Sequence, residues 1–147
     1  MTNVSEPLLV SQVHFSDDRG DVMHYGAQTL GSVARIYFIR PKLEAGFRGW
    51  HGHRFESKIF RCVTGSFVVA SVRVTDWSGN PFQAEPQSWT LSAITGDLLI
   101  VPEGFANGIL PLEEGSSLMV MSNRTLSESQ GDDLRFPPEY FPVPKAS

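Results

Sequence analysis

Cysteine is scarce in this chain, since Cys62 is its only one. A single cysteine excludes an internal disulfide framework and is typical of proteins in a reducing cytoplasm. Long apolar runs are missing as well, because no stretch approaches the roughly 18 residues that a membrane span requires. The first residues lack the basic and apolar regions of a signal peptide. These absences predict a soluble, cytoplasmic protein.

No window of the sequence has the period of about 3.6 residues that an amphipathic helix requires. Instead, runs of β-branched, aromatic and aliphatic residues are separated by turns that contain many of the 13 glycines and 10 prolines. This pattern predicts an all-β sandwich or barrel. The length of 147 residues fits one domain, and a hydrophobic fraction of 41% suffices for a core. We expect strands over residues 32–40, 58–63, 66–74, 88–91, 98–101 and 117–122.

Positive charge is concentrated in one part of an otherwise acidic chain, whose formal net charge is −4. Residues 35–61 contain seven of the twelve basic residues and only two acidic ones, which leaves a formal charge of +5 on this segment. A basic segment in an acidic protein suits a small phosphate-bearing molecule better than a nucleic acid, which requires a larger basic surface. Arginines solvated at the surface would give the same pattern.

Two spaced motifs indicate the fold. The first runs from Arg48 to Gly65 and contains His51, His53 and Lys58. In metal-binding cupins, two histidines one residue apart precede a glutamate and then a glycine, and on a strand such histidines share one face. In the present chain Lys58 stands at the glutamate position.

The second motif begins at Gly96 and continues from Pro102 to Asn107. It matches the second cupin motif, except that Asn107 stands where the last metal-ligating histidine belongs. Two motifs in order and at their proper spacings predict a cupin jelly roll, in which two antiparallel sheets enclose a pocket.

The two substitutions argue against a bound metal. Metal ligands must be anionic or neutral donors, whereas Lys58 brings a positive charge and Asn107 is a poor ligand for a transition metal. Two histidines alone do not make a tight site. We therefore expect a pocket without metal or other cofactor, in which a histidine acts as general base beside cationic groups that stabilise an oxyanion.

These motifs and several further segments resemble the dTDP-4-dehydrorhamnose 3,5-epimerases and the related nucleotide-sugar 3,4-ketoisomerases, which are metal-free cupins. The resemblance covers about residues 10–125 and implies one cupin-like domain over residues 1–147, with a C-terminal tail over residues 131–147. The tail is rich in proline and aromatic residues, and we expect it to pack as an extended cover. The matching segments are residues 18–20, 48–51, 58–65, 91–92 and 100–108.

The resemblance implies an isomerase that acts on a dTDP-linked 4-keto-6-deoxy sugar, as part of deoxysugar biosynthesis. It implies that His51 removes the proton beside the ketone and that Lys58 stabilises the enolate. His53 matches the second histidine of the ketoisomerase pattern and is the next candidate for the base. It further implies a substrate-binding role for Arg48. We also expect substrate contacts from the remaining candidates, Arg19, Tyr37, Arg61 and Asn107.

The chain also departs from the epimerase pattern. Epimerases carry a tyrosine about fourteen residues after the last histidine of the second motif, and it serves as the acid on the opposite face of the sugar. Counting fourteen residues from Asn107 ends at Met121, which cannot donate a proton. The aspartate that supports the catalytic histidine has only Asp132 and Asp133 as weak candidates.

Two alternatives to the isomerase therefore stay open: a non-catalytic cupin that binds a sugar or nucleotide sugar, and a metal-dependent cupin enzyme. In each case we expect a homodimer, because pairing across a two-fold axis covers the exposed sheet edges of a small sandwich.

Overall fold

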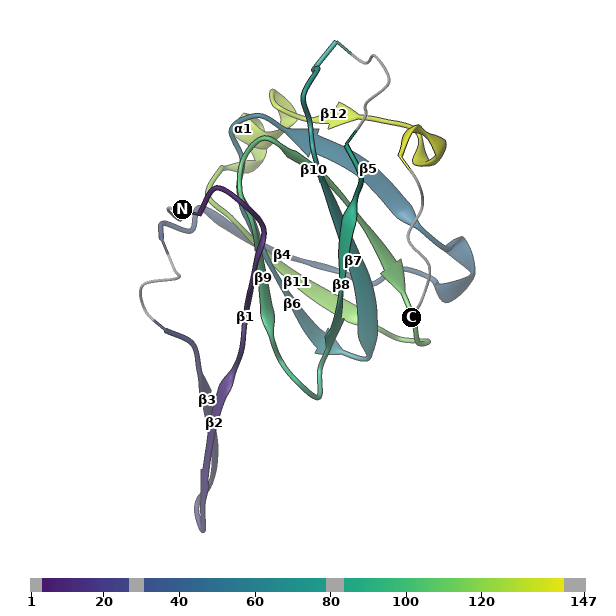
Figure 1. Cartoon of the computed structure of the whole chain (residues 1–147). Coiled ribbons are helices and arrows are strands. Elements are labelled where there is room, and N and C mark those ends of the chain that lie inside the picture. Colours follow the sequence, from purple (N-terminus) through teal and green to yellow (C-terminus); the bar gives the residue numbers. More distant parts are fainter. Residues whose placement is uncertain (1–3, 27–30, 79–83, 142–147) are drawn as a thin grey trace.

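The computed structural model describes residues 4–26, 31–78 and 84–141, which form two five-stranded antiparallel sheets (Figure 1). The first sheet has the order β1 (Leu8–Val10), β9 (Leu98–Val101), β6 (Lys58–Thr64), β11 (Ser117–Ser122), β4 (Arg35–Ile39). The second sheet has the order β12 (Leu134–Arg135), β5 (Arg48–His53), β10 (Phe105–Pro111), β7 (Ser66–Arg73), β8 (Gln87–Ser92). The predicted all-β sandwich is confirmed.

The remaining elements are short. Strands β2 (Val13–Asp17) and β3 (Gly20–His24) form a hairpin that projects away from both sheets (Figure 1). Helix α1 covers Leu126–Gln130, and two 3₁₀ turns cover Leu43–Ala45 (η2) and Pro138–Tyr140 (η3). Within the described ranges, no helix has the length and hydropathy of a membrane-spanning segment.

All six predicted strands are present, within three residues of their predicted ends. The expected strands do not include β1, β2, β3, β5, β10 or β12, and no helix is expected at α1. Strand β10 contains Asn107 and Gly108, which interrupt its apolar pattern. Helix α1 is too short for a helical period, but it has a capping box in which the Thr125 hydroxyl accepts from the backbone N–H of Glu128.

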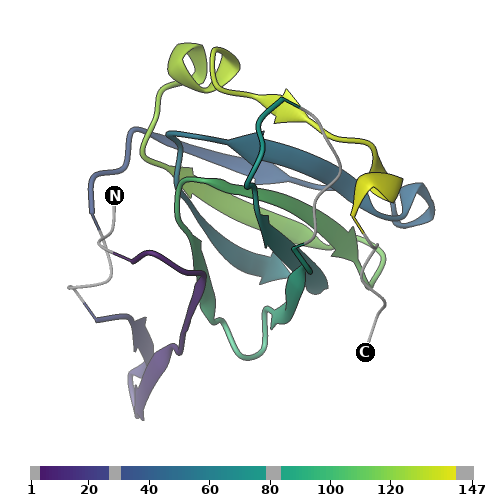
Figure 2. The ribbon, with the colours of Figure 1, turned by 45° about the horizontal axis from the view of Figure 1, so that its top comes forward.

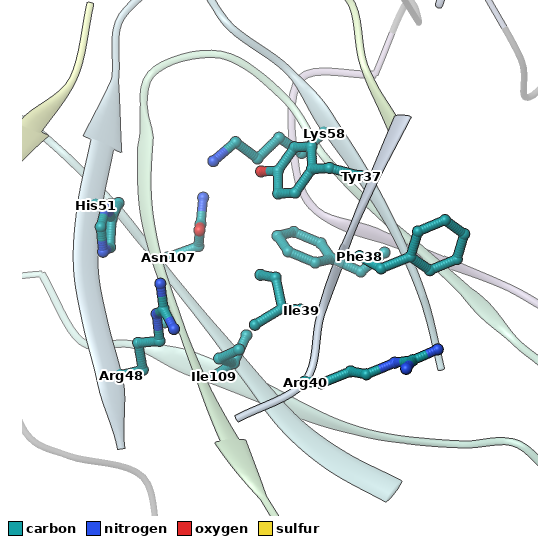
Figure 3. A pocket seen from close by; sticks show the side chains of 11 residues that line it. Tyr37, Phe38, Ile39, Arg40, Arg48, His51, Lys58, Asn107 and Ile109 are labelled. Carbon is teal, nitrogen blue, oxygen red and sulfur yellow. The ribbon is translucent and has the colours of Figure 1, made fainter. Parts of the chain in front are cut away.

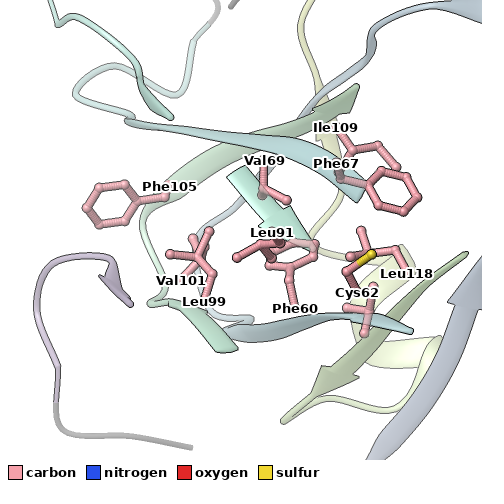
Figure 4. Close-up of a cluster of buried hydrophobic side chains, with 11 residues drawn as sticks. Phe60, Cys62, Phe67, Val69, Leu91, Leu99, Val101, Phe105, Ile109 and Leu118 are labelled. Atoms are coloured by element: carbon pink, nitrogen blue, oxygen red, sulfur yellow. The ribbon is translucent and has the colours of Figure 1, made fainter. Parts of the chain in front are cut away.

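The main core lies between the two sheets (Figure 4). Alternate residues of each strand point inward, as the two-residue period of a strand requires. The first sheet contributes Phe60 and Leu118, and the second contributes Phe67 and Phe105. This cluster closes one end of the space between the sheets, and polar residues line the other end.

A β-bulge in β5 decides which side chains face inward. Asn107 of β10 pairs with His51, and Ile109 pairs with Arg48, so β5 has one residue more than β10 over this interval. A regular strand would place Arg48 and His51, three residues apart, on opposite faces. The extra residue reverses that relationship, and both side chains line the same cavity.

The C-terminal segment covers the outer face of the second sheet (Figure 2). Strand β12 pairs with β5, and the rings of Phe136 and Phe141 are buried with Trp50, which points outward from β5. The rings of Trp50 and Phe141 meet edge to face at a centroid distance of 5.2 Å. The end of the predicted tail, residues 142–147, lies outside the described residues.

Candidate active site

A cavity of about 360 Å³ opens between the two sheets, at the polar end of the sandwich. The second sheet lines it with Arg48, His51 and Asn107, and the first sheet lines it with Tyr37 and Lys58. In Figure 3 the Lys58 amino group and the Tyr37 hydroxyl point toward the side of the cavity that His51 occupies. Five of the eight predicted site residues therefore line one cavity.

His51 is held as a neutral base. Its Nδ1 lies 3.5 Å from Oδ1 of Asp133. Burial lowers the pKa of His51, and the charges of Lys58 and Arg135 lower it further, whereas the charge of Asp133 raises it. The pKa of His51 stays below its usual value in sum, so the imidazole is unprotonated at neutral pH and can accept a proton.

Asp133 owes its position to its neighbour Asp132. The Asp132 carboxylate accepts hydrogen bonds from the backbone N–H groups of Arg54, Phe55 and Glu56, at 2.9 to 3.1 Å. These contacts fix the segment after α1 against the turn between β5 and β6. Burial raises the pKa of Asp133, but a hydrogen bond from Arg135 and the neighbouring histidines lower it in sum. Asp133 is therefore a carboxylate that can orient His51.

Lys58 begins β6 and is only 8% exposed. Its Nζ lies 3.1 Å from Nε2 of His53, which is 3% exposed and does not line the 360 Å³ cavity. His53 therefore lies beside Lys58. It borders a second hollow of about 530 Å³, which it shares with His51 and Lys58.

The histidines and their neighbours do not fit a metal site. Nε2 of His53 contacts an ammonium group, which leaves no lone pair for a cation. Within the described residues, no group of three or more His, Cys, Asp or Glu side chains could hold a metal ion. These side chains therefore form a network of hydrogen bonds and charges, and the positive charge in it comes from Lys58 and not from a metal ion.

Two predicted substrate-binding residues lie elsewhere. Arg61 is three residues from Lys58, and β6 pairs regularly with β9 between them, so the Arg61 side chain points to the opposite, outer face. There its guanidinium donates to Gln12 and Tyr25 of the N-terminal segment. Arg19 lies in the β2–β3 turn, where it pairs with Asp17 at 2.7 Å. Arg61 and Arg19 therefore do not line the cavity with the other candidates, and their substrate contacts stay a prediction.

Met121 does not occupy the place of a catalytic acid. It faces outward from β11 and packs against Ile59, Leu98 and Ile100 on the outer side of the first sheet. Its neighbour Val120 points inward and pairs with Tyr37. The phenol that faces the cavity is Tyr37 of β4, so the missing tyrosine at position 121 does not leave the pocket without a hydroxyl acid.

Two carboxylates complete the site, the partly buried Asp133 and the buried Glu56, and the sequence motifs give them little weight. Asp133 was a weak candidate because it lies far from His51 along the chain. The sequence motifs do not single out Glu56, although it lies three residues after His53, close to the glutamate position of the cupin motif. It is 2% exposed and its Oε1 lies 3.3 Å from Nδ1 of His53.

No protein-family model matches the sequence, and a search of curated proteins gives no match. Solved structures do match. The dTDP-4-dehydrorhamnose 3,5-epimerase from Bacillus anthracis, with TDP and pyrophosphate bound, superposes with a TM-score of 0.75 at 22% identity, over 99% of this chain and 90% of the other.

Two further similar structures belong to proteins that are named for other activities. A 3'-monoepimerase from Streptomyces bikiniensis in complex with dTDP-quinovose has a TM-score of 0.74 at 18% identity, over 94% of this chain and 74% of the other. The 3,4-ketoisomerase QdtA from Thermoanaerobacterium thermosaccharolyticum, in complex with TDP, has a TM-score of 0.69 at 19% identity, over 94% and 93%. The chain therefore has the jelly-roll fold of these dTDP-sugar epimerases and isomerases, the group that its sequence motifs resemble.

Proposed function

We propose that this protein is a metal-independent isomerase of nucleotide-linked 4-keto-6-deoxy sugars, either an epimerase or a 3,4-ketoisomerase. The observation that carries the proposal is the arrangement of the neutral base His51 opposite the ammonium group of Lys58 within one cavity (Figure 3). A proton beside a ketone becomes removable only when the developing enolate charge is neutralised nearby. The described cavity supplies both requirements.

The proposed reaction begins with proton transfer to His51. The imidazole accepts the proton from the carbon next to the ketone, the C–H electron pair becomes a carbon–carbon double bond, and the carbonyl oxygen becomes an enolate. Lys58 stabilises that oxygen by a charge-assisted hydrogen bond. Asp133 keeps His51 oriented and stabilises the imidazolium that forms.

The return of the proton decides the product. Protonation of the same carbon from the opposite face inverts it, which is epimerisation. Protonation of the former carbonyl carbon, with a proton passing from the neighbouring hydroxyl to the enolate oxygen, moves the ketone instead. Tyr37 comes from the sheet opposite His51 and is the group we assign as the proton donor on that second face.

The nucleotide part of the substrate is assigned to the open side of the cavity. Arg48 is exposed at this side, and Arg40 also lines the cavity. The Arg48 guanidinium suits a phosphate group, which it can bind through paired hydrogen bonds. The bound TDP and dTDP-sugar in the structurally similar proteins support a thymidine nucleotide as the carrier.

The binder alternative loses its main support, because it rested on Met121, which lies outside the cavity. The test of the proposed function is incubation of the wild-type protein with dTDP-4-keto-6-deoxyglucose in D₂O, followed by NMR. Deuterium at C3 or C5 with the ketone kept at C4 identifies an epimerase. Deuterium at C4 with the ketone moved to C3 identifies a ketoisomerase. Incorporation at no sugar carbon contradicts the proposal.

We also infer that the protein is a cytoplasmic homodimer. The β2–β3 hairpin exposes Val13, Phe15, Val22 and Met23, each by about half or more of its surface. Ile36 and Phe38 are exposed on the edge strand β4, at 56% and 57%. Apolar side chains on a projecting hairpin and on a free edge favour pairing with a second copy. Light scattering at micromolar concentration checks this, and a monomeric mass contradicts it.

A further inference from the structure

Glu56 is a buried carboxylate with four polar neighbours. Its Oε2 accepts from the hydroxyl of Ser122 at 2.6 Å and from Arg35 at 3.2 Å. Its Oε1 accepts from the hydroxyl of Ser129 at 2.6 Å and lies 3.3 Å from Nδ1 of His53. Burial raises the pKa of Glu56, but the charge of Lys58 and the two hydroxyl hydrogen bonds lower it in sum. Glu56 is therefore ionised at neutral pH.

The contacts of His53 determine its tautomer. Its Nε2 lies 3.1 Å from Nζ of Lys58, and an ammonium group can only donate hydrogen bonds. Nε2 must therefore be the unprotonated, accepting nitrogen, and the ring proton is on Nδ1, which faces Glu56. Burial and the charge of Lys58 lower the pKa of His53 to about 4, so the ring is neutral at pH 7.

Resting on the proposed function, we propose that Glu56 and His53 form a relay that positions the Lys58 ammonium against the enolate oxygen. The negative charge of Glu56, 3.3 Å from Nδ1, favours the tautomer with the proton on Nδ1, and the opposite nitrogen then accepts one hydrogen bond from Lys58. The lysine keeps its other protons for the substrate. Glu56 and His53 are positioning residues in this scheme, and neither touches the reacting atoms.

Removal of the negative charge has a defined consequence. In Glu56→Gln the side-chain amide can turn its NH₂ group toward Nδ1, so the tautomer with Nε2 protonated is less strongly disfavoured, and that N–H faces the lysine as donor against donor. Lys58 then moves away from its place in the cavity. The rate of α-proton exchange falls about 10- to 100-fold, the loss typical of one charge-assisted hydrogen bond. The dissociation constant of the nucleotide sugar changes less than about threefold, because Arg48 and the cavity walls are untouched.

A double-mutant cycle separates positioning from general support of the fold. If Glu56 acts through Lys58, the double variant Glu56→Gln/Lys58→Met exchanges no more slowly than Lys58→Met alone. If the double variant instead loses exchange rate by the product of the two single losses, the relay is overturned. Glu113→Gln is the matched control, since it converts a carboxylate that accepts from Ser66 at the surface and leaves exchange unchanged.

A measurement without turnover tests the relay in the wild-type protein. In ¹⁵N-histidine-labelled protein, NMR should show His53 neutral and protonated at Nδ1 from pH 7 down to about pH 5. A resonance pattern for protonation at Nε2, or for imidazolium at pH 7, overturns the relay even when the enzyme is active. If the wild-type protein exchanges no substrate proton, the proposed function fails. The NMR measurement of the His53 tautomer then still shows whether Glu56, His53 and Lys58 are arranged as the relay requires.

Variants at His53 give a second route if Glu56→Gln does not fold. The amide oxygen of His53→Gln can accept from Lys58, whereas His53→Leu offers no acceptor. We expect His53→Gln to exchange at least about tenfold faster than His53→Leu. Equal rates in two folded variants overturn the relay.

Discussion

Nδ1 of His51 lies 3.5 Å from Oδ1 of Asp133, which connects strand β5 to the segment that follows helix α1. The carboxylate raises the pKa of His51, while burial and two cations lower it more strongly. Basicity and orientation of the proposed base thus depend on a residue from the far end of the chain.

Asp133→Asn should change the pH profile of exchange with a defined sign. In the wild type the rate rises with pH as His51 loses its proton, and because its pKa is lowered, the midpoint lies below pH 6.5. The variant loses the one charge that raises this pKa, so the midpoint moves to still lower pH. The plateau rate falls at least about tenfold, since the base is weaker and less well oriented. A midpoint that moves to higher pH contradicts this assignment.

Lys58→Met should lower the exchange rate by about 10²–10³-fold, the loss typical of removing one oxyanion donor. The side chain of methionine fills a similar volume without charge, so the sandwich should stay folded. Lys42→Met serves as the control, because Lys42 is an exposed lysine beside the η2 turn. Single-turnover kinetics of both variants checks the prediction, and similar rates for the two would refute the role of Lys58.

Arg48→Ala should weaken binding of the nucleotide sugar and of the free nucleoside diphosphate by about 10- to 100-fold, because a charge-assisted contact to phosphate is lost. Arg61→Ala is the matched control, since Arg61 also belongs to the basic segment but lies on the outer face of β6. Isothermal titration with TDP measures both. Equal weakening in the two variants would mean that general charge, not Arg48, binds the phosphates.

The buried histidine His53 should make the protein less stable in mild acid. Its pKa is lowered from 6.5 to about 4 in the folded state. Between these values the unfolded chain binds more protons, so the free energy of unfolding falls as pH decreases through this window. The expected loss from pH 7 to pH 5 is about 2 kcal/mol. Urea denaturation at both pH values measures it, with His14→Gln as a control at an exposed histidine; no change between the two pH values contradicts the assignment.

The strand pattern and the motifs predicted much of this site, but they did not predict on which face of its strand each side chain lies. Arg48 and His51 are three residues apart, and so are Lys58 and Arg61. The first pair shares a face because β5 contains a bulge, whereas the second pair lies on opposite faces because β6 is regular between its two members. Local sequence does not distinguish the two cases, because the bulge depends on pairing with β10.

Contacts between distant segments were also beyond prediction. Asp133 reaches His51 only because Asp132 binds the backbone of the β5–β6 turn. The count that ended at Met121 failed because a shift of one residue on a strand moves a side chain to the other face. Tyr37, which does face the cavity, lies on an edge strand whose alternation alone left its orientation open.

The most direct test of the central claim, that His51 is the base, compares wild type and His51→Asn in D₂O with dTDP-4-keto-6-deoxyglucose. The account predicts that the variant loses deuterium incorporation by about 10²–10⁴-fold, the usual contribution of a general base. Its affinity for TDP should stay within about threefold of wild type, since Arg48 remains. Incorporation by His51→Asn at the wild-type rate would contradict the account and place the base elsewhere in the cavity.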